Sequence, residues 1–500
     1  MHKLATLIFI ALLFVVDAKA DTYFVGFTDK AGCQYTLDHP ETFLSERAIE
    51  RRAKQNIAVD STDLPVSALY LDSLRRIGVS IVHTTRWLNG ATVTLPGNLT
   101  ATSLKALGFI DIVQCTKRDG LIPIVPPMSK GLPVTAAWQQ ANATATDYAA
   151  EYIAMLRLDS LHSLGYHGQG IRIGVIDNGF LNVNSLSVYS QARDHIISAA
   201  DIVNTQGSIY DTGSHGAMVL ALIAGMVDDT IIGTATKAEY CLYRAEDDDS
   251  ESMKEADNVV RALEMADSAG VDIATISLGY YEFDDTTSNY TYADMNGRIA
   301  RCSRAATMAA NKGMLVCVAA GNEGDKEWHY IDSPADAEDI LTVGGVEGNR
   351  EYSRFSSLGP TSDMRIKPDI CAMATAVPIY YPTDFARHNG TSFASPAIAG
   401  AAACLWSALP QLTAQQLRET IIRHSDRYSN PDNQYGYGIP DMTAAYYEIA
   451  AEVESPKPTE DNNITAVYTI NGIYCGNDLN RLGHGIYIVR LAGSVRKIMK

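Results

Sequence analysis

Short, strongly apolar segments alternate with longer apolar segments through residues 150–450. Residues 171–176 and 314–320 are β-branched or otherwise apolar almost without interruption, which is typical of strands buried on both faces. Residues 217–225 and 397–405 continue the apolar pattern far enough to predict buried helices. Buried strands that alternate with helices favour an α/β fold for this part of the chain.

Residues 21–120 have a different pattern, in which strands and amphipathic helices follow one another in a mixed order. We expect strands at 22–27, 81–84, 91–95 and 110–114, and helices at 43–55, 67–78 and 103–107. This order predicts a separate domain of the α+β class.

The two ends of the chain and two polar segments complete the predicted organisation. Residues 1–20 combine a short polar start, an apolar core and a small-residue cleavage site, so they predict a signal peptide. The apolar core is shorter than the ~20 residues that cross a bilayer, and we expect no transmembrane segment. Residues 121–149 and 451–463 have linker composition, and residues 464–500 predict a small β tail.

Ser392 lies in the segment Gly-Thr-Ser-Phe-Ala-Ser-Pro that leads directly into the apolar run 397–405. We expect Pro396 in the first helical turn, where its missing N–H costs nothing. Ser392 then stands at a helix N-terminus, where unpaired N–H groups stabilise developing negative charge. The alternative is an ordinary helix-capping serine.

Three further polar residues occupy comparable places. Asp177 ends the predicted strand 171–176, His215 begins the predicted helix that includes 217–225, and Asn322 follows the strand 314–320. Each has an ordinary explanation: a capping aspartate, a core histidine and an asparagine in a left-handed turn. Together they form a complete set for acyl transfer. Ser392 would attack, His215 would move the proton, Asp177 would orient the imidazole, and Asn322 would donate to the oxyanion.

With these motifs the chain resembles the subtilisin-like serine peptidases, or subtilases, across roughly residues 145–450. The resemblance rests on Val-Ile-Asp-Asn-Gly at Asp177, Ser-His-Gly at His215, Ala-Ala-Gly-Asn at Asn322, and the segment around Ser392. The order Asp, His, Ser along the chain is the subtilisin order. The resemblance implies a three-layer fold with a mostly parallel central sheet and helices on both faces.

The resemblance also assigns substrate-binding residues. Substrate is expected to lie extended along Ser277, Leu278 and Gly279, which resemble the family's substrate-lining strand. Ala319, Ala320 and Gly321 are expected, with Ser277, to form the floor of the S1 pocket. Tyr280 and Tyr281 are candidates for narrowing the cleft. Asn178 and Ala217 depart from the family's usual residues beside the Asp and His motifs and affect only the local helix cap.

The flanking regions resemble parts of exported proteases. Residues 21–120 look like the propeptide of a subtilase, which implies an intramolecular inhibitor removed by cleavage within 121–149; the alternative is a permanent accessory domain. Residues 464–500 resemble the C-terminal sorting domains of secreted Bacteroidetes proteins, which implies recognition by export machinery. We therefore expect an exported protein, placed extracellularly, at the cell surface or in the periplasm.

Charge and cysteine content limit the partners. A net charge of −18 and a pI near 5.0 argue against nucleic acid or an anionic membrane as partners. The acidic run 246–251 is interpreted as a solvated loop rather than a calcium site or a rim for cationic substrates. The chemistry needs no cofactor, and a structural calcium ion remains possible without assignable ligands. Cys33 and Cys115 are candidates for a bridge.

The sequence thus predicts a secreted serine endopeptidase that hydrolyses peptide bonds through an acyl-enzyme and is made as a self-processing zymogen. Its expected partners are protein or peptide substrates. The alternative is a catalytically silent surface protein that keeps the subtilase fold for binding.

Overall fold

The computed structural model describes residues 21–124, 132–133, 145–228, 230–454, 464–469, 472–483, 486–491 and 494–499. The predicted signal peptide and most of the two predicted linkers lie outside the described residues. Compact units are formed by residues 1–442 and 443–500, and each is described by itself.

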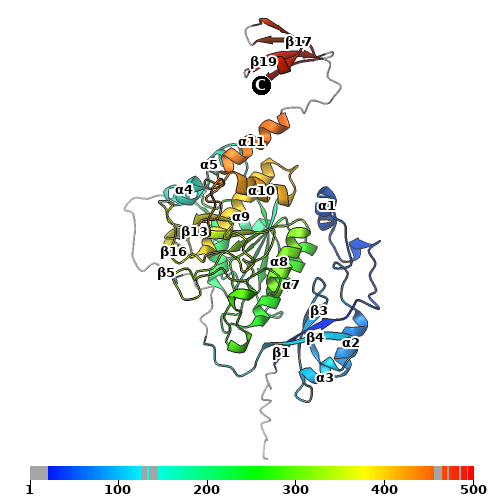
Figure 1. Cartoon of the computed structure of the whole chain (residues 1–500). Coiled ribbons are helices and arrows are strands. Elements are labelled where there is room, and N and C mark those ends of the chain that lie inside the picture. Colours follow the sequence, from blue (N-terminus) through cyan, green and yellow to red (C-terminus); the bar gives the residue numbers. More distant parts are fainter. Residues whose placement is uncertain are drawn as a thin grey trace, which may run out of the picture. The chain divides into compact units, whose positions relative to one another are not determined.

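The N-terminal domain is an antiparallel sheet with helices, as predicted (Figure 1). The sheet has the order β2-β3-β1-β4, and its elements are β1 (Thr22–Phe27), β2 (Ser80–Thr85), β3 (Gly90–Thr94), β4 (Ile110–Lys117), α1 (Glu46–Lys54), α2 (Ala68–Arg76) and α3 (Ala101–Lys105). Helix α1 begins three residues later than the pattern predicts, because the Ser45 side chain accepts from the Ala48 N–H and caps the helix.

The centre of the larger unit is a seven-stranded sheet whose neighbouring strands are all parallel, which confirms the predicted α/β class. Its order is β14-β13-β12-β11-β6-β10-β7, from β14 (Ile370–Met373), β13 (Leu341–Val346), β12 (Leu315–Ala319), β11 (Ile273–Ile276), β6 (Arg172–Asp177), β10 (Glu239–Arg244) and β7 (Ile196–Asp201). The chain extends the sheet from β6 in both directions, so β6 and β11 flank a topological switch point.

Helices cover both faces of this sheet. Helices α7 (Met253–Ser268) and α8 (Arg301–Asn311) lie side by side and bury one face (Figure 1). Helices α6 (Ser214–Ala224) and α9 (Thr391–Ala408) pack together and contact the opposite face of the sheet. This arrangement is the three-layer architecture that the resemblance implies.

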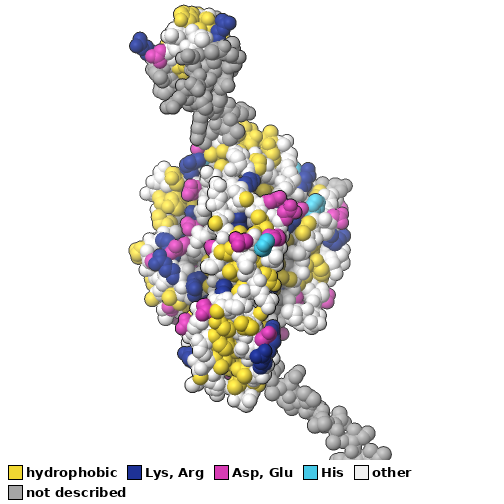
Figure 2. All heavy atoms as spheres, turned by 90° about the vertical axis from the view of Figure 1, so that its right-hand side faces the viewer, with side chains coloured by type: hydrophobic (Ala, Val, Ile, Leu, Met, Phe, Trp, Pro, Cys, Tyr) yellow, Lys and Arg dark blue, Asp and Glu magenta, His cyan; other side chains and the backbone are white. Residues whose placement is uncertain are grey.

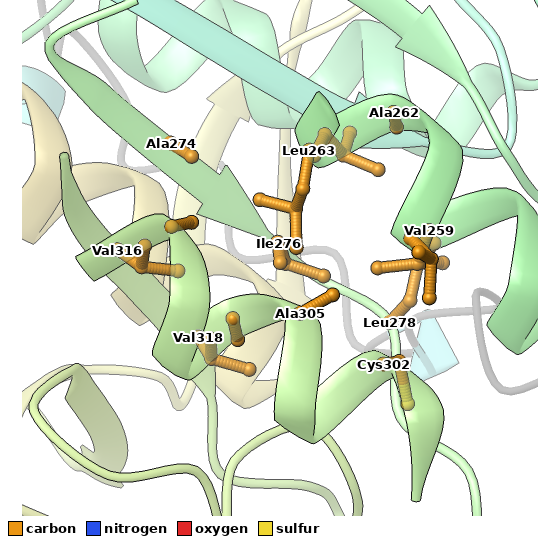
Figure 3. Packing of buried hydrophobic residues seen from close by; sticks show 14 of the residues in the cluster. Val259, Ala262, Leu263, Ala274, Ile276, Leu278, Cys302, Ala305, Val316 and Val318 are labelled. Atoms are coloured by element: carbon orange, nitrogen blue, oxygen red, sulfur yellow. The ribbon is translucent and has the colours of Figure 1, made fainter. Parts of the chain in front are cut away.

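Alternation along the strands decides which side chains meet which helices. In β11 and the residues after it, Ala274, Ile276 and Leu278 point into the core between the sheet and helices α7 and α8 (Figure 3). The intervening side chains point the opposite way, so the Thr275 hydroxyl lies 3.2 Å from that of Ser395 on α9. Polar residues at alternate positions are therefore directed toward α9.

Several predicted boundaries differ from the structure. Helix α4 (Ala145–Met155) begins inside the predicted linker 121–149, and α11 (Met442–Glu454) runs into the predicted linker 451–463. The short strand β5 (Leu132–Pro133) also lies in the first linker, where it pairs with β16 (Phe385–Asn389). This pairing joins segments far apart in the sequence, so a local pattern does not predict it.

The C-terminal unit contains an antiparallel sheet of order β18-β17-β19-β20. Its strands are β17 (Ile464–Thr469), β18 (Tyr474–Gly476), β19 (Ile486–Leu491) and β20 (Ser494–Met499). Only a small apolar cluster centred on Val467 and Val489 holds it together among the residues described. Among the described residues, the remaining elements are α5 (Asp159–Ser163), α10 (Ala414–Arg423), β8 (Met226–Val227), β9 (Thr230–Ile231), β15 (Val377–Tyr380) and six short 3-10 helices.

Candidate active site

The candidate site forms where the carboxyl ends of β6, β11 and β12 meet the first turns of α6 and α9. Asp177 ends β6, Ser277 follows β11, and Asn322 follows β12. His215 and Ser392 are the second residues of their helices. The sheet therefore brings together residues that are far apart in the sequence, at the edge where α/β proteins bind ligands.

Asp177 and His215 form a buried pair. Asp177 is fully buried, and its Oδ1 accepts a hydrogen bond of 2.8 Å from His215 Nδ1 and another of 2.8 Å from the Asn178 N–H. This contact assigns the proton to Nδ1 and leaves Nε2 of the neutral ring as an acceptor. Nε2 is buried and has no hydrogen-bond partner in the structure.

The close approach of α6 to β6 depends on a glycine. A Cβ on Gly216 would lie 2.3 Å from the Gly179 carbonyl oxygen and 2.8 Å from the Asp177 Cβ, so only glycine fits there. Asn178, which departs from the family pattern, caps this helix: its Oδ1 accepts from the Gly216 N–H at 3.1 Å and its Nδ2 donates to Asp248 at 3.0 Å. The departure therefore preserves the position of His215.

Ser392 is held by Ser277 rather than by His215. Helix α9 begins at Thr391, so Pro396 is its sixth residue and lies inside the helix; the prediction that Pro396 falls in the first turn is wrong. Because Pro396 has no N–H, the Ser392 carbonyl lacks its helical partner. The Ser277 hydroxyl donates to that carbonyl at 2.9 Å, and the Ser392 hydroxyl donates to the Ser277 carbonyl at 3.4 Å.

Asn322 is oriented by the residue before the candidate nucleophile. Its Oδ1 accepts from the Thr391 N–H at 2.9 Å and from the Thr391 hydroxyl at 3.1 Å. Because its oxygen is occupied on that side, the Nδ2 group is left for an acceptor in the pocket that Asn322 and Ser392 both line.

The pocket beside Ser392 contains most of the predicted substrate-binding residues. Its lining consists of Ser277, Leu278, Gly279, Ala319, Gly321, Asn322, Asp332, Thr391 and Ser392. Ala320 is not among them, because strand alternation turns its side chain into the core beneath α7 and α8. Ser277–Gly279 are also not part of a strand, since β11 ends at Ile276.

Asp332 is a lining residue that the sequence analysis missed. It stands in the irregular segment between β12 and β13 and is fully buried. Its only sequence signal is an aspartate between an isoleucine and Ser-Pro, which by itself is ordinary for a turn.

Two expectations about the cleft and the acidic run are corrected. The Tyr280 ring is buried in the core, where its hydroxyl donates to Glu246 at 2.7 Å, so it does not narrow the cleft. Tyr281 is partly exposed and stacks on Trp328 at 4.5 Å. Glu246 and Glu251 are buried, so the run 246–251 is not a solvated loop.

Metal-binding and cysteine chemistry find little support in the parts of the chain that the structure describes. There, no group of three or more His, Cys, Asp or Glu side chains is placed to hold a metal ion. Cys33 and Cys115 are free thiols, so the expected bridge is not formed.

Comparison with known proteins agrees with this arrangement. A model of the subtilase family, Peptidase S8, matches residues 168–438, and a model of the Peptidase S8 propeptide domain of Bacteroidota matches residues 22–121. Subtilisin DY of Bacillus licheniformis is 28% identical over 298 residues, which are 59% of this chain and 97% of the relative. Subtilisin E of Bacillus subtilis (strain 168) is 28% identical over 317 residues, which are 62% and 75% of the two chains.

Solved structures with lower sequence identity are also similar to this chain. The crystal structure of MycP1 with its N-terminal propeptide removed is 23% identical, with a TM-score of 0.47, and the match covers 59% of this chain and 97% of MycP1. MycP1 from Mycobacterium smegmatis is 21% identical with a TM-score of 0.48, and 63% and 88% of the two chains are covered. The family model spans more than half of the chain, and the chain belongs to the subtilase family of serine endopeptidases.

Proposed function

We propose that this protein is a secreted endopeptidase that hydrolyses peptide bonds with Ser392 as nucleophile, His215 as general base and Asp177 as the group that orients the histidine. The observation that carries the proposal is the buried Asp177–His215 hydrogen bond of 2.8 Å at the same sheet edge as Ser392. These residues are a subtilisin-order triad in a chain of the subtilase family.

The first step is proton transfer from Ser392 to His215. In the structure the Ser392 hydroxyl donates to the Ser277 carbonyl, and His215 Nε2 has no partner. The Ser392 side chain must therefore rotate, so that its hydroxyl leaves the Ser277 carbonyl and donates to His215 Nε2. The alkoxide then attacks the substrate carbonyl carbon, and His215 returns the proton to the departing amine, which leaves an acyl-enzyme. Water then attacks the ester. His215 takes a proton from the water and gives it to the departing Ser392 oxygen.

Negative charge on the tetrahedral intermediate is met by two donors. The Ser392 N–H is one of the first N–H groups of α9 and has no acceptor within the helix. The Asn322 Nδ2 group is the second, since its oxygen is fixed by Thr391. Donors fixed before the reaction stabilise this charge without reorganising, which is how such sites lower a barrier.

We further propose that residues 21–120 inhibit the enzyme until they are removed. Helices α7 and α8 contact this domain through buried ion pairs. Asp267 of α7 binds the guanidinium groups of Arg51, Arg52 and Arg86, and Asp257 binds Arg301, which also reaches Gln114. The three arginines hold the pKa of Asp267 below its ordinary value against the effect of burial. Breaking a buried pair of this kind typically costs 3–5 kcal/mol.

The end of this domain and the chain after it contact the protease at several described residues. Lys117 donates to the Ser250 hydroxyl at 2.7 Å, and the Ile124 N–H donates to Asp284 at 2.8 Å; both partners lie in loops after β10 and β11. Farther along, Leu132 pairs with Asn389, three residues before Ser392. This pairing supports self-cleavage, which requires the chain near Leu132 to come close to Ser392.

We propose export by the predicted signal peptide 1–20 and recognition of the tail 464–500 by export machinery, with a final place outside the cell, at its surface or in the periplasm. In the described part of the chain no helix is both long and apolar enough to cross a membrane. A bound calcium ion remains a proposal without assigned ligands.

Self-processing of the full chain tests the function. In a protease-free preparation we expect the chain to shorten within 121–149, and Ser392→Ala to stay full length, because the attacking oxygen is gone. The matched control is Ser407→Ala on the same helix. The Ser407 hydroxyl bonds to the Cys404 carbonyl and not to the site, so this variant should shorten normally. Shortening of Ser392→Ala at the normal rate would contradict the proposal.

A further inference from the structure

A carboxyl group without a partner lies in the wall of the pocket beside Ser392. Asp332 is fully buried, and neither of its carboxyl oxygens accepts a hydrogen bond. The carboxyl lies against two glycines of the same pocket: a Cβ on Gly321 would come within 2.2 Å of Oδ2, and one on Gly279 within 3.1 Å. Because these two glycines have no side chains, only backbone atoms separate the carboxyl from the pocket.

Among the described residues, no lysine, arginine or histidine forms an ion pair with this carboxyl. Glu323 is close enough to raise its pKa, and the Glu323 oxygens are already bonded to Lys326 at 2.9 Å and to the Tyr281 hydroxyl at 3.2 Å. Burial first, and then Glu323, raises the pKa of Asp332 well above its ordinary value, while Lys326 and the Trp328 indole oppose part of that shift. The Trp328 N–H is near the carboxyl but does not meet the geometry of a hydrogen bond.

Several other buried aspartates of this protein have cationic partners. Asp257 has Arg301, and Asp369 is bound by Lys367 at 2.6 Å and by Arg418 at 2.8 Å. A buried carboxyl that lacks such a partner destabilises the folded protein, and more so when the carboxyl is charged. Asp332 lacks such a partner and lies in the wall of the pocket beside the candidate nucleophile.

We propose that Asp332 is the floor of the S1 pocket and selects substrates with a lysine or arginine at P1. This inference rests on the proposed function, since P1 is defined by attack of Ser392. An unbranched side chain passes between Gly279 and Gly321, and its cationic end supplies the partner that Asp332 lacks. Burial strengthens that contact, because water does not screen it.

The chain carries a candidate substrate of this kind. The sequence between Ile124 and Leu132 contains a single basic residue, Lys130. Leu132 is the second residue after it and pairs with Asn389 next to the nucleophile segment. We therefore expect the first cleavage of the full chain between Lys130 and Gly131.

Two peptides that differ only at P1 test the inference on the processed enzyme. One has lysine and the other has norleucine, which has nearly the same shape and no charge. We expect kcat/KM to be at least about tenfold higher for lysine, because hydrogen bonds to charged groups contribute ~1.5–3 kcal/mol. Asp332→Asn should abolish this preference, so that it cleaves the two peptides with similar kcat/KM values.

Fluorophosphonate labelling separates this inference from the proposed function. The reagent modifies an activated serine whatever the S1 pocket prefers, so labelled Asp332→Asn protein is folded and competent. Equal or better cleavage of the norleucine peptide by the unchanged enzyme would overturn the inference, and so would a lysine preference that survives Asp332→Asn. If the unchanged enzyme is not labelled at all, the proposed function fails first. First cleavage after an uncharged residue would also count against Asp332.

Discussion

The side chain that most directly controls the candidate nucleophile is Ser277. Its hydroxyl donates to the Ser392 carbonyl, which has no helical donor because Pro396 lacks an N–H. Its carbonyl in turn accepts from the Ser392 hydroxyl. One residue thus fixes the backbone of the first turn of α9 and holds the hydroxyl until substrate binds. Ser277 is a positioning residue, because it acts through Ser392.

We predict that Ser277→Ala lowers kcat with little change in KM, by up to about tenfold, as expected for a hydrogen bond with a net contribution of ~0.5–1.5 kcal/mol. The loss should shrink when Pro396→Ala is also present, because alanine restores the N–H that the Ser392 carbonyl lacks. A double-mutant cycle on kcat measures this coupling. Losses that simply add would show that the two groups do not share the carbonyl.

The sequence predicts well where the candidate catalytic residues stand on strands and helices, and predicts poorly which residues surround them. Asp177, His215, Asn322 and Ser392 follow strand ends or begin helices, and such places are visible in the apolar pattern. Asp332 is not visible, because its burial against Gly279 and Gly321 depends on contacts between distant segments.

At the level of elements, strand alternation and helix starts explain the pocket. Ala319 and Gly321 face α9 while Ala320 faces α7 and α8, and the period of two along β12 would have separated them from sequence alone. Helix boundaries were less predictable. The start at Thr391, which puts Pro396 beyond the predicted first turn, depends on which residue supplies the cap, here Gly390.

Helix α9 carries the candidate nucleophile, and its packing depends on a glycine in its middle. A Cβ on Gly400 would lie 1.9 Å from the Thr234 hydroxyl oxygen and 2.8 Å from its Cβ. Gly→Ala inside a helix normally stabilises a protein by up to ~1 kcal/mol. In Gly400→Ala the clash with Thr234 outweighs this stabilisation, because overpacking typically costs 1–3 kcal/mol.

We therefore predict that Gly400→Ala lowers the free energy of unfolding, measured by denaturant titration of the processed enzyme. Gly348→Ala is the matched control in the same unit, since the nearest atom to its Cβ would be Met373 Cε at 3.8 Å; its stability should hardly change. An increase in stability for Gly400→Ala would show that α9 has room to move.

At the level of the whole molecule, the contact between the N-terminal domain and the protease is built from buried charge. The sequence predicts α1 as a charged amphipathic helix, but not that Arg51 and Arg52 are buried against Asp267 of a distant helix. The net charge of −18 argues against a nucleic acid or an anionic membrane as partner. On the face drawn in Figure 2, the basic side chains of the described residues are interspersed with acidic ones.

One histidine makes this contact sensitive to pH. His83 of β2 bonds through Nε2 to Asn258 Oδ1 of α7 at 3.2 Å. Burial, and then the nearby Arg261 and Lys254, lowers its pKa from 6.5 to about 4. The joined domains therefore bind fewer protons than the separated ones between pH 4 and 6.5, so acidification through that window weakens their association.

We predict that the cleaved N-terminal domain stays bound at pH 7.5 and dissociates more readily at pH 5, measured by native mass spectrometry. His83→Gln keeps a donor for Asn258 but does not titrate, so its dissociation should depend less on pH. The exposed His39→Gln is the control and should behave like the unchanged protein. Buried carboxylates such as Glu264 are common to all three proteins, and an identical pH dependence in all three would exclude His83.

The central claim is that Ser392 is an activated nucleophile whose activation needs His215. The most direct measurement is fluorophosphonate labelling of the protein from residue 21 onward, once its N-terminal domain has been removed, with the adduct mapped by mass spectrometry. We expect one adduct per chain, on Ser392, and none in His215→Ala. A folded, processed protein without an adduct, or with an adduct that survives His215→Ala, would contradict it.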